Sequence, residues 1–424
     1  MTAHALDELA WRGLIASSTD VDELRAEMAR APISVYCGFD PTAPSLHMGN
    51  LLQILTLRRL QDAGHRPFGL VGGATGMIGD PKEAGERRLN ELETVQRWTA
   101  VIREQLGRFL SFEGSNAATV VNNYEWTAPL STIEFLRDIG KHFPVNKMLA
   151  RDVVRSRLEA GISYTEFSYV LLQSMDYLTL HRQHGVTLQT GGSDQWGNIT
   201  SGVDLVRRVT GTRVHALATP LVTKADGTKF GKTESGTVWL DATMTSPYAF
   251  HQFWLNSDDR EVVDLLKFFT FRTQEEIGDL ERQRVDAPQL RAAQRALADD
   301  VTALVHGPEQ AVKAGAAAAA LFGAGEVQAL DAATLDAALR ETPYVDVPAG
   351  DQLPTYADLL AATTLASSRG AARRMIGEGG AYVNNVRITD ADSRPERSQL
   401  MAGGWLLLRR GRRNLAGVRV TREG

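Results

Sequence analysis

Polar side chains that could bind a phosphate stand at the start of a predicted helix. The stretch "PTAPSLHMGNLLQIL" covers residues 41–55, and His47 and Asn50 lie three residues apart in it. At that spacing they share one face of the first turns, and Gly49 lets a ligand approach the backbone. A helix start also presents unpaired amide groups and partial positive charge, which favour phosphate. The pattern indicates a phosphate site, although a lone histidine at a helix start is more often a surface or capping residue.

A second candidate phosphate site lies in "KADGTKFGKTESG", residues 224–236, which places three lysines around a glycine-containing loop. The P-loop motif needs four residues between its glycines, whereas Gly227 and Gly231 enclose three, so this motif is excluded. Lys229, Lys232 and Thr233 could still stabilise the charge of a polyphosphate leaving group. A solvated basic turn is the competing interpretation.

Two further stretches offer polar groups for a small ligand. "YVLLQSMDY" places Tyr169, Gln173 and Asp176 on one helix face among apolar residues. Since desolvated polar groups need partners, this stripe predicts a buried polar pocket, with a solvated helix face as the alternative. "TGGSDQWGN" offers Asp194 and Gln195 in a glycine-rich turn that suits sugar hydroxyls or an amino group.

The elements that must position these residues follow from the apolar runs. "APISVYCGFDPT" and "RPFGLVGGATGMIGDP" read as strands on either side of a helix, "LHMGNLLQILTLRRLQDAG", and "ATVVNNYEW" and "VTLQTGGSDQWGNI" contain later strands. Strand, helix and strand in close succession predict a parallel α/β sheet. Ligands of such sheets bind at the carboxyl ends of the strands, so we expect the polar loops to converge on one crevice.

Length and composition set the wider limits. A chain of 424 residues with 43% hydrophobic and 23% charged residues predicts a globular protein of more than one domain. No apolar run is long enough to span a membrane and the N-terminus does not resemble a signal peptide, so we expect a soluble, cytoplasmic protein without membrane attachment. The single cysteine, Cys37, excludes an internal disulfide and a cysteine-only zinc site.

Changes in composition and hydrophobic periodicity along the sequence predict four parts. We expect an α/β catalytic domain with a Rossmann-like parallel sheet over 1–246, an all-helical domain over 247–325, a linker over 326–353 and a small α+β module over 354–424. The last part carries twelve arginines against three Asp and three Glu, a net charge of +6, whereas the rest carries −11. This asymmetry favours a polyanionic partner at the basic end, and a charge chosen for solubility is the alternative.

The combination of motifs identifies a family. "YCGFDPTAPSLHMGN", "LVGGATGMIGDP", "YVLLQSMDY", "TGGSDQWGN" and "KFGKTESG", in this order, closely resemble the bacterial tyrosyl-tRNA synthetases, which are class I aminoacyl-tRNA synthetases. "HMGN" resembles the HIGH signature of that class and "KFGKT" resembles its KMSKS signature. "SSRGAARRMIGEGGAYVNNV" is similar to a small RNA-binding module first described in a ribosomal protein.

The resemblance implies an activity and partners. The family activates L-tyrosine with ATP, giving tyrosyl-adenylate and pyrophosphate, and then transfers tyrosyl to the 3′-terminal adenosine of tRNA(Tyr). It implies an anticodon-binding role for the helical domain, a homodimer, and Mg²⁺ that accompanies ATP without a dedicated metal site in the protein.

The resemblance also assigns roles to residues. For catalysis it implies His47, Asn50, Lys229, Lys232 and Thr233. The substrate phenol would meet Tyr36 and Asp176, and the rest of the tyrosine site would comprise Thr75, Asp80, Tyr169, Gln173 and Gln195. ATP would contact Gly38, Asp40, His47, Gly49, Asn50, Gly192, Asp194 and Lys232. In the C-terminal module Arg369, Arg373 and Arg374 would meet RNA phosphates.

Two departures from the family pattern and three rivals remain open. Asn50 stands where many relatives have histidine, and "GDPKEAGERRLN" aligns poorly with their mobile basic loop, where Lys82, Arg87 and Arg88 are available. The rivals are a tryptophanyl-tRNA synthetase, a small nucleotidyltransferase with a similar signature, and a non-catalytic RNA-binding descendant. Tyr36 and Asp176 argue against the first, chain length against the second, and the retained His47 and lysines against the third.

Overall fold

The computed structural model describes residues 5–81, 90–223, 230–233, 236–322, 326–350, 352–411 and 414–421, without the side chains of Lys232 and Thr233. The chain forms two compact units. The first comprises Met1–Asp241 and Val263–Ile277, and the second comprises Ala242–Val262 and Gly278–Gly424. Each unit is described by itself. Lys229 and the three basic residues Lys82, Arg87 and Arg88 lie outside the described residues.

The first unit is built on a six-stranded sheet with the strand order β1-β6-β5-β2-β3-β4. Its strands are β1 (Ser17–Ser18), β2 (Ser34–Phe39), β3 (Arg66–Val71), β4 (Thr119–Asn122), β5 (Val186–Gly192) and β6 (His215–Thr219). Only β1 runs antiparallel to its neighbour, and the remaining strands are parallel. This confirms the predicted parallel α/β sheet.

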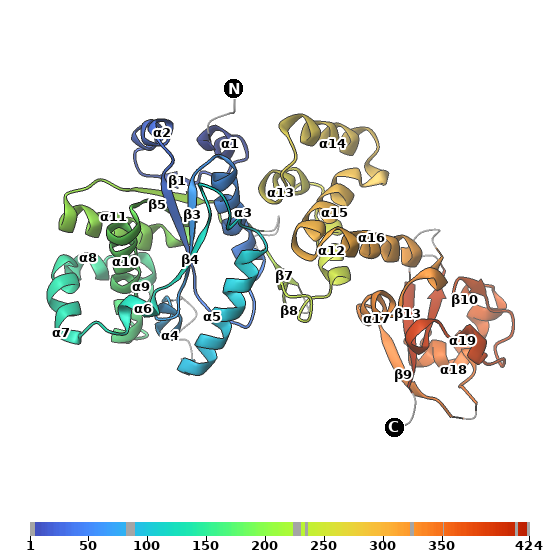
Figure 1. Cartoon of the computed structure of the whole chain (residues 1–424). Helices are drawn as coiled ribbons and strands as arrows, with labels where there is room; N and C mark the ends of the chain where they lie inside the picture. Colours follow the sequence, from blue (N-terminus) through green and yellow to red (C-terminus); the bar gives the residue numbers. More distant parts are fainter. Residues whose placement is uncertain are drawn as a thin grey trace. The chain divides into compact units, whose positions relative to one another are not determined.

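Helices cover both faces of this sheet (Figure 1). α10 (Tyr164–His184) and α11 (Trp196–Thr210) pack together on one face, whereas α3 (Met48–Asp62) and α5 (Leu92–Gly107) lie on the other. The shared core on the α10 side includes Tyr36, Leu70 and Met175. Because both faces are covered, the central strands β2 and β3 are largely apolar.

Shorter helices complete the first unit. They are α1 (Ala5–Trp11), α2 (Val21–Arg30), α4 (Thr75–Ile78), α6 (Tyr124–Thr127), α7 (Thr132–Glu134), α8 (Val145–Leu149), α9 (Asp152–Arg157) and α13 (Val262–Phe269). The chain passes from β2 outward to β3 and β4 and then returns to the opposite side of β2 as β5. That reversal creates a switch point at the carboxyl ends of β2 and β5, which is where such sheets bind ligands.

Residues 263–277 pack with the first unit, so the helical domain expected over 247–325 is interrupted. Two buried arginines explain why. Arg12 Nη1 donates to the carbonyl oxygen of Lys267 at 2.9 Å, and Arg59 Nη2 donates to that of Thr270 at 2.7 Å. The last carbonyl groups of a helix lack partners within the helix and attract cations. The end of α13 is therefore held by side chains from α3 and from the residue that follows α1.

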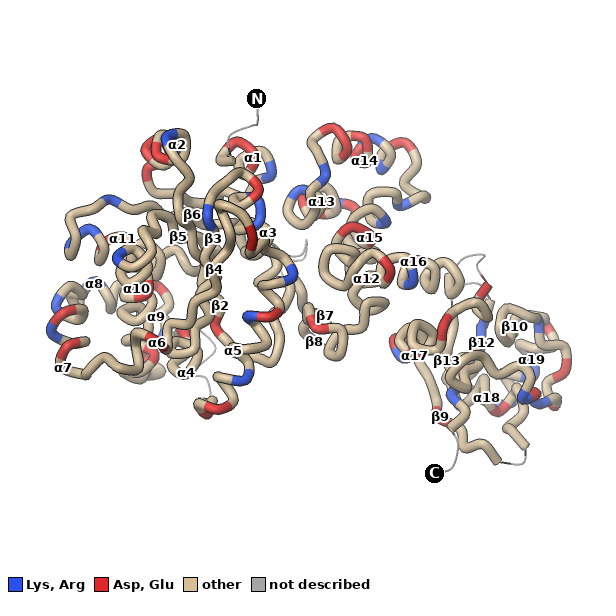
Figure 2. Tube along the Cα trace, in the orientation of Figure 1, with Lys and Arg blue, Asp and Glu red and all other residues tan. Residues whose placement is uncertain are grey.

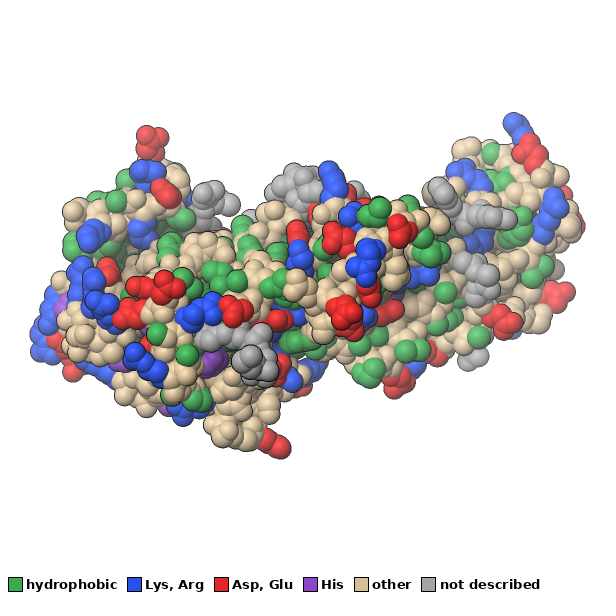
Figure 3. Space-filling model, turned by 90° about the horizontal axis from the view of Figure 1, so that it is seen from above, with side chains coloured by type: hydrophobic (Ala, Val, Ile, Leu, Met, Phe, Trp, Pro, Cys, Tyr) green, Lys and Arg blue, Asp and Glu red, His purple; other side chains and the backbone are tan. Residues whose placement is uncertain are grey.

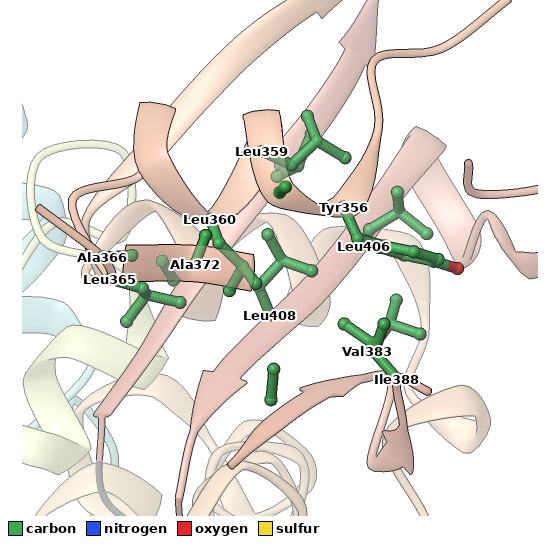
Figure 4. Close-up of a cluster of buried hydrophobic side chains, with 14 of the residues drawn as sticks. Tyr356, Leu359, Leu360, Leu365, Ala366, Ala372, Val383, Ile388, Leu406 and Leu408 are labelled. Atoms are coloured by element: carbon green, nitrogen blue, oxygen red, sulfur yellow. The ribbon is translucent and has the colours of Figure 1, made fainter. Parts of the chain in front are cut away.

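The second unit contains helices and a five-stranded sheet of order β11-β10-β12-β13-β9. Its helices are α12 (Pro247–Leu255), α14 (Gln274–Asp286), α15 (Ala292–His306), α16 (Pro308–Phe322), α17 (Ala332–Arg340), α18 (Tyr356–Ala362) and α19 (Arg369–Gly377). Its strands are β9 (Tyr344–Pro348), β10 (Ala381–Val383), β11 (Val386–Arg387), β12 (Trp405–Arg410) and β13 (Asn414–Thr421). Figure 4 shows Leu360, Leu406 and Leu408 packed between α18 and the strands, which confirms the predicted α+β module.

The segment expected as a linker, 326–353, is structured. It contains α17 and β9, and β9 pairs in parallel with β13. Leu335 and Leu339 are fully buried in one cluster with Leu321 and Trp405, so apolar side chains of this segment join the helices to the sheet. The three prolines of "ETPYVDVPAGDQLP" suggested a linker. The leucines at 335 and 339, four residues apart, instead give α17 a buried apolar face. Among the described residues, no helix is long and apolar enough to cross a membrane.

Candidate active site

His47 caps the first turn of α3. The backbone N–H of Gly49 donates to His47 Nδ1 at 3.0 Å, and the N–H of His47 donates to Asn50 Oδ1 at 3.1 Å. The two side chains thus form a reciprocal capping pair, which confirms the structural role that a histidine at a helix start often has. Because Nδ1 accepts, a neutral His47 ring carries its proton on Nε2. Asn50 keeps its amide NH₂ group to donate.

The hairpin that carries Lys232 lies against this turn. β7 (Lys232–Thr233) pairs with β8 (Gly236–Thr237), and the N–H of Met48 donates to the carbonyl of Val238 at 3.3 Å. Gly231 has a φ of +81°, and a Cβ at this position would lie 2.7 Å from Met48 Cβ. The fold therefore brings the described part of the second predicted phosphate-binding stretch, 230–233 and 236, against the start of α3, about 180 residues earlier in the sequence.

Tyr36 and Asp176 lie at one buried end of the site. Tyr36, on β2, is 1% exposed, and no partner for its hydroxyl is found among the described residues. Burial raises the pKa of Tyr36 well above its usual value of 10, and the nearby Asp176 adds to this rise. Asp176, on α10, accepts hydrogen bonds from Asn123 Nδ2 at 2.9 Å and Trp126 Nε1 at 2.8 Å. Burial raises the pKa of Asp176 to about 7 against the opposing effect of these two donors.

Asp40 links Tyr169 on α10 with Thr75 in the glycine-rich stretch after β3. Its carboxylate accepts from Thr75 Oγ1 at 2.7 Å and from the Tyr169 hydroxyl at 2.7 Å. Asn123 Nδ2 in turn donates to Thr75 Oγ1 at 3.0 Å. A Cβ on Gly72 would lie 1.9 Å from Asp40 Oδ1, so only glycine allows this approach. Gln173 lies on the same helix as Tyr169, and its Oε1 has no hydrogen-bond partner among the described residues.

Asp80 is a further carboxylate of the site, and two amide groups hold it. Gln195 Nε2 donates to one of its oxygens at 2.9 Å, and Asn198 Nδ2 donates to the other at 3.1 Å. Burial raises the pKa of Asp80, whereas these two donors and the charge of Arg151 lower it. The site thus has one buried carboxylate, Asp176, held by an amide and an indole N–H, and one partly buried carboxylate, Asp80, held by two amides. Such an arrangement suits a cationic or hydroxyl ligand.

The remaining predicted ATP residues also lie at the carboxyl ends of the strands. Gly38 is on β2, and Gly192 ends β5 just before the exposed Asp194. Gly38, Asp40, Gly192 and Asp194 therefore border the switch point between β2 and β5. Of the described residues predicted for tyrosine and ATP, all lie in the first unit.

The three arginines predicted to bind RNA lie on α19, as expected. Arg369 forms an ion pair with Asp358, and Arg373 forms one with Asp392. Arg374 is exposed and has no ion-pair partner among the described residues. Basic and acidic positions stand side by side around α18 and α19 in Figure 2, and both signs also alternate across the face shown in Figure 3.

Sequence reasoning missed several contacts at this site. Asn123 and Trp126, which hold Asp176, belong to the stretch "NNYEW", whose position after a strand was the available signal. Asn198 ends the quoted stretch "TGGSDQWGN" but had no assigned role. Arg151, which donates to Asn198, gave no signal in the sequence.

Comparison with known proteins identifies the family. The family described as "tRNA synthetases class I (W and Y)" matches residues 28–323, and "Tyrosine--tRNA ligase SYY-like C-terminal domain" matches residues 335–418. The chain is 60% identical to a tyrosine–tRNA ligase of Streptomyces avermitilis over 98% of this chain and 99% of the relative. It is 58% identical to that of Mycobacterium tuberculosis over 99% of both chains.

Solved structures agree with the sequence matches. A C-terminally truncated mitochondrial tyrosyl-tRNA synthetase of Aspergillus nidulans is similar with a TM-score of 0.68 and 30% identity, over 74% of this chain and 92% of that one. A tryptophanyl-tRNA synthetase of Encephalitozoon cuniculi shares the fold with a TM-score of 0.54 but only 13% identity, over 72% and 87% of the two chains. The chain belongs to the tyrosine–tRNA ligase family of class I aminoacyl-tRNA synthetases, enzymes that join tyrosine to tRNA at the expense of ATP.

Proposed function

We propose that Tyr36 and Asp176 read the phenol of L-tyrosine during its activation by ATP. The observation that carries this proposal is the buried Tyr36 hydroxyl, which has no partner among the described residues and lies beside a buried carboxylate. A buried polar group without a partner costs about 1–3 kcal/mol, so a fold has reason to keep it only where a ligand satisfies it. The substrate hydroxyl would accept from Tyr36 and donate to Asp176.

The amino group of the substrate would lie near Asp80. We assign its ammonium group to Asp80, Tyr169 and Gln173, with Thr75 and Gln195 in support. Asp80 accepts from two neutral amides, and each carboxylate oxygen has a further lone pair for an N–H donor. Gln173 Oε1, for which the described part of the chain supplies no hydrogen-bond donor, is a second acceptor. The two carboxylates would thus fix opposite ends of one tyrosine.

ATP would bind along the switch point, with Gly38, Asp40, Gly192 and Asp194 at the nucleoside and His47, Gly49 and Asn50 at the phosphates. The tyrosine carboxylate attacks the α-phosphate, the bond to the β-phosphate breaks, and pyrophosphate leaves with its electron pair. Nε2–H of His47 and the Asn50 amide would donate to the developing charge, and Lys229, Lys232 and Thr233 would stabilise the leaving group. Mg²⁺ would arrive as the magnesium complex of ATP.

Transfer requires RNA to reach the adenylate. We propose that helices within 247–325 bind the anticodon arm of tRNA(Tyr) and that the module over 354–424 binds RNA through Arg369, Arg373 and Arg374. In this proposal 1–246, 247–325 and 354–424 name the catalytic, anticodon-binding and RNA-binding regions, with the exception that 263–277 belong to the catalytic unit. We place the enzyme in the cytoplasm, in keeping with its single buried cysteine.

The proposed reaction is tested by exchange of pyrophosphate into ATP with single amino acids. We expect exchange with tyrosine and little with phenylalanine or tryptophan. Asp176→Asn should lower kcat/KM for tyrosine by about tenfold or more, because the substrate hydroxyl loses a charged acceptor. An unchanged preference for tyrosine over phenylalanine in this variant would remove Asp176 from the proposed role.

We also propose a homodimer formed through the segment from α7 to the start of α10. Apolar side chains there face solvent: Ile133 is 70% exposed, Val145 60% and Tyr164 66%. Clustered exposed apolar groups of this kind mark protein interfaces. Ile133→Glu should yield monomers in sedimentation velocity, whereas Val312→Glu, at another exposed apolar position on α16, should leave the dimer intact. A dimer that survives both changes would place the contact elsewhere.

A further inference from the structure

Arg151 begins a chain of hydrogen bonds that ends on Asp80. It is the residue that precedes α9, and its Nη2 donates to Asn198 Oδ1. Asn198 Nδ2 donates to Gln195 Oε1 at 3.0 Å and to Asp80 Oδ1 at 3.1 Å. Gln195 Nε2 completes the chain by donating to Asp80 Oδ2 at 2.9 Å. We call this chain of four residues the amide relay.

The direction of the amide relay is set at its arginine end. A guanidinium group can only donate, so the side of Asn198 that faces Arg151 must be its oxygen. The Asn198 NH₂ group must then point toward Gln195 and Asp80. Since it meets Gln195 at an acceptor, the Gln195 NH₂ group also points toward Asp80. Every dipole in the relay thus presents its positive end to the Asp80 carboxylate.

Burial makes this orientation costly to lose. Asn198 is only 2% exposed, so its oxygen would be left without a partner if Arg151 were removed. Arg151 is itself partly buried and lines a pocket of about 250 Å³ together with Lys147, Asp204 and Arg208. The charge of Asp80 attracts the Arg151 guanidinium group and opposes the cost of its burial.

We propose that Arg151 is a positioning residue for tyrosine activation, which acts through Asn198 and Gln195 to keep Asp80 oriented toward the substrate ammonium group. This inference rests on the proposed role of Asp80. Arg151 itself does not touch the substrate in this scheme. It lies outside the quoted motifs, in the segment between α8 and α9, and it affects the amino end of the site but not the phenol end.

Two competitive inhibitors of pyrophosphate exchange separate these ends. Tyramine has the phenol and the amino group but no carboxylate, whereas 3-(4-hydroxyphenyl)propionate has the phenol and the carboxylate but no amino group. For Arg151→Met we expect the inhibition constant of tyramine to rise about tenfold and that of the propionate to stay within about twofold. Arg155→Met is the matched control, because Arg155 lies one turn later and pairs only with the exposed Asp152 in the described ion pairs.

Three further variants test the relay, and two of them, Asn198→Ala and Arg151→Lys, remain usable if Arg151→Met folds poorly. Asn198→Ala should weaken tyramine to a similar extent, and the double variant should be no worse than either single variant, because both break the same chain. Arg151→Lys keeps a donor and a charge, so it should restore part of the tyramine affinity. Additive losses in the double variant would overturn the relay.

Asp80→Asn distinguishes the inference from the proposed function beneath it. Selective loss of tyramine in Asp80→Asn with no selective loss in Arg151→Met would refute the relay and leave the role of Asp80 intact. Equal weakening of both inhibitors in Arg151→Met would show a general structural role and would also refute the inference. If Asp80→Asn itself fails to discriminate between the inhibitors, the assignment of the amino group to Asp80 is wrong.

Discussion

The substitution Tyr36→Phe should separate stability from function. The Tyr36 ring is 1% exposed and packs edge-on against Tyr177, with ring centroids 5.2 Å apart, and a phenylalanine ring retains these contacts. Only the hydroxyl is lost, and it has no partner among the described residues. Because an unpaired buried hydroxyl costs about 1–3 kcal/mol, the free enzyme should gain about 1 kcal/mol or more in its free energy of unfolding.

Tyr177→Phe is the matched control. Tyr177 is equally buried, but its hydroxyl donates to the carbonyl of His215 at 2.7 Å. Its removal breaks a made hydrogen bond and should cost about 0.5–1.5 kcal/mol. The two Tyr→Phe changes, on neighbouring rings, should therefore shift the free energy of unfolding in opposite directions. Urea unfolding followed by tryptophan fluorescence measures both, without substrate.

Addition of L-tyrosine should reverse the advantage of Tyr36→Phe. A ligand at 100 times its Kd stabilises a folded protein by about 2.7 kcal/mol, and a tenfold weaker Kd reduces this to about 1.4 kcal/mol. At one tyrosine concentration the variant should thus gain about 1.3 kcal/mol less than the wild type. Its kcat/KM preference for tyrosine over phenylalanine in pyrophosphate exchange should fall in parallel.

Two results would refute this reasoning. If Tyr36→Phe lowers the free energy of unfolding as much as Tyr177→Phe does, the Tyr36 hydroxyl has a structural partner in the free enzyme. If tyrosine stabilises the variant and the wild type equally, Tyr36 does not contact the substrate.

Four further predictions concern Asp176, the Lys232 hairpin and two arginines of α19. Since Asp176 is protonated below a pH of about 7, kcat/KM for tyrosine should rise as the pH passes through about 7. Trp126→Phe should move this rise to higher pH, because the Trp126 N–H is a donor that lowers the pKa of Asp176. A pH profile that does not move in Trp126→Phe would contradict this prediction. Gly231→Ala should lower kcat for adenylate formation with little change in the Kd of tyrosine, because the added Cβ would lie 2.7 Å from Met48 Cβ. Gly236→Ala is the control: its φ is +119°, but a Cβ there would meet no atom within 4 Å in the described structure, so its effect should be weaker. Arg374→Ala should weaken tRNA binding and reduce the slope of log K against log salt by about 1, as the loss of one phosphate contact does. Arg373→Ala should weaken binding further, because it leaves Asp392 without its ion-pair partner beside the RNA phosphates, and equal effects of the two changes in a salt titration would argue against that repulsion.

Because of the contacts in the second unit, deletion of the C-terminal module is a poor test of its role in RNA binding. Deletion after Leu353 would leave β9 without its partner β13 and would expose the buried cluster that Trp405 shares with Leu335 and Leu339. Loss of aminoacylation after such a deletion would then combine lost RNA contacts with a damaged helical region. Substitutions of Arg369, Arg373 and Arg374 on α19 avoid this problem, since these side chains are exposed.

Some features of the site can be predicted from the local sequence. The glycines and polar residues after β2, β3 and β5 are recognisable because parallel strands place their carboxyl ends at one edge. The helical spacing of Tyr169, Gln173 and Asp176 fixes a shared face of α10 before any fold is known. Resemblance to a family then supplied the substrate, which no spacing in the chain specifies.

Sequence by itself thus determined the parallel α/β sheet, the edge at which ligands bind, and the residue types available there, because these depend on periodicity over a few residues. Tertiary structure alone decided which side chains meet: Trp126 on Asp176, the Lys232 hairpin on Met48, and Arg151 on Asn198. It also decided that the Tyr36 hydroxyl has no hydrogen-bond partner among the described residues whereas the Tyr177 hydroxyl has one, although both are buried tyrosines. The physical reason is that a hydrogen bond requires two atoms within about 3 Å, and separations of that size between distant segments are set only when strands and helices pack.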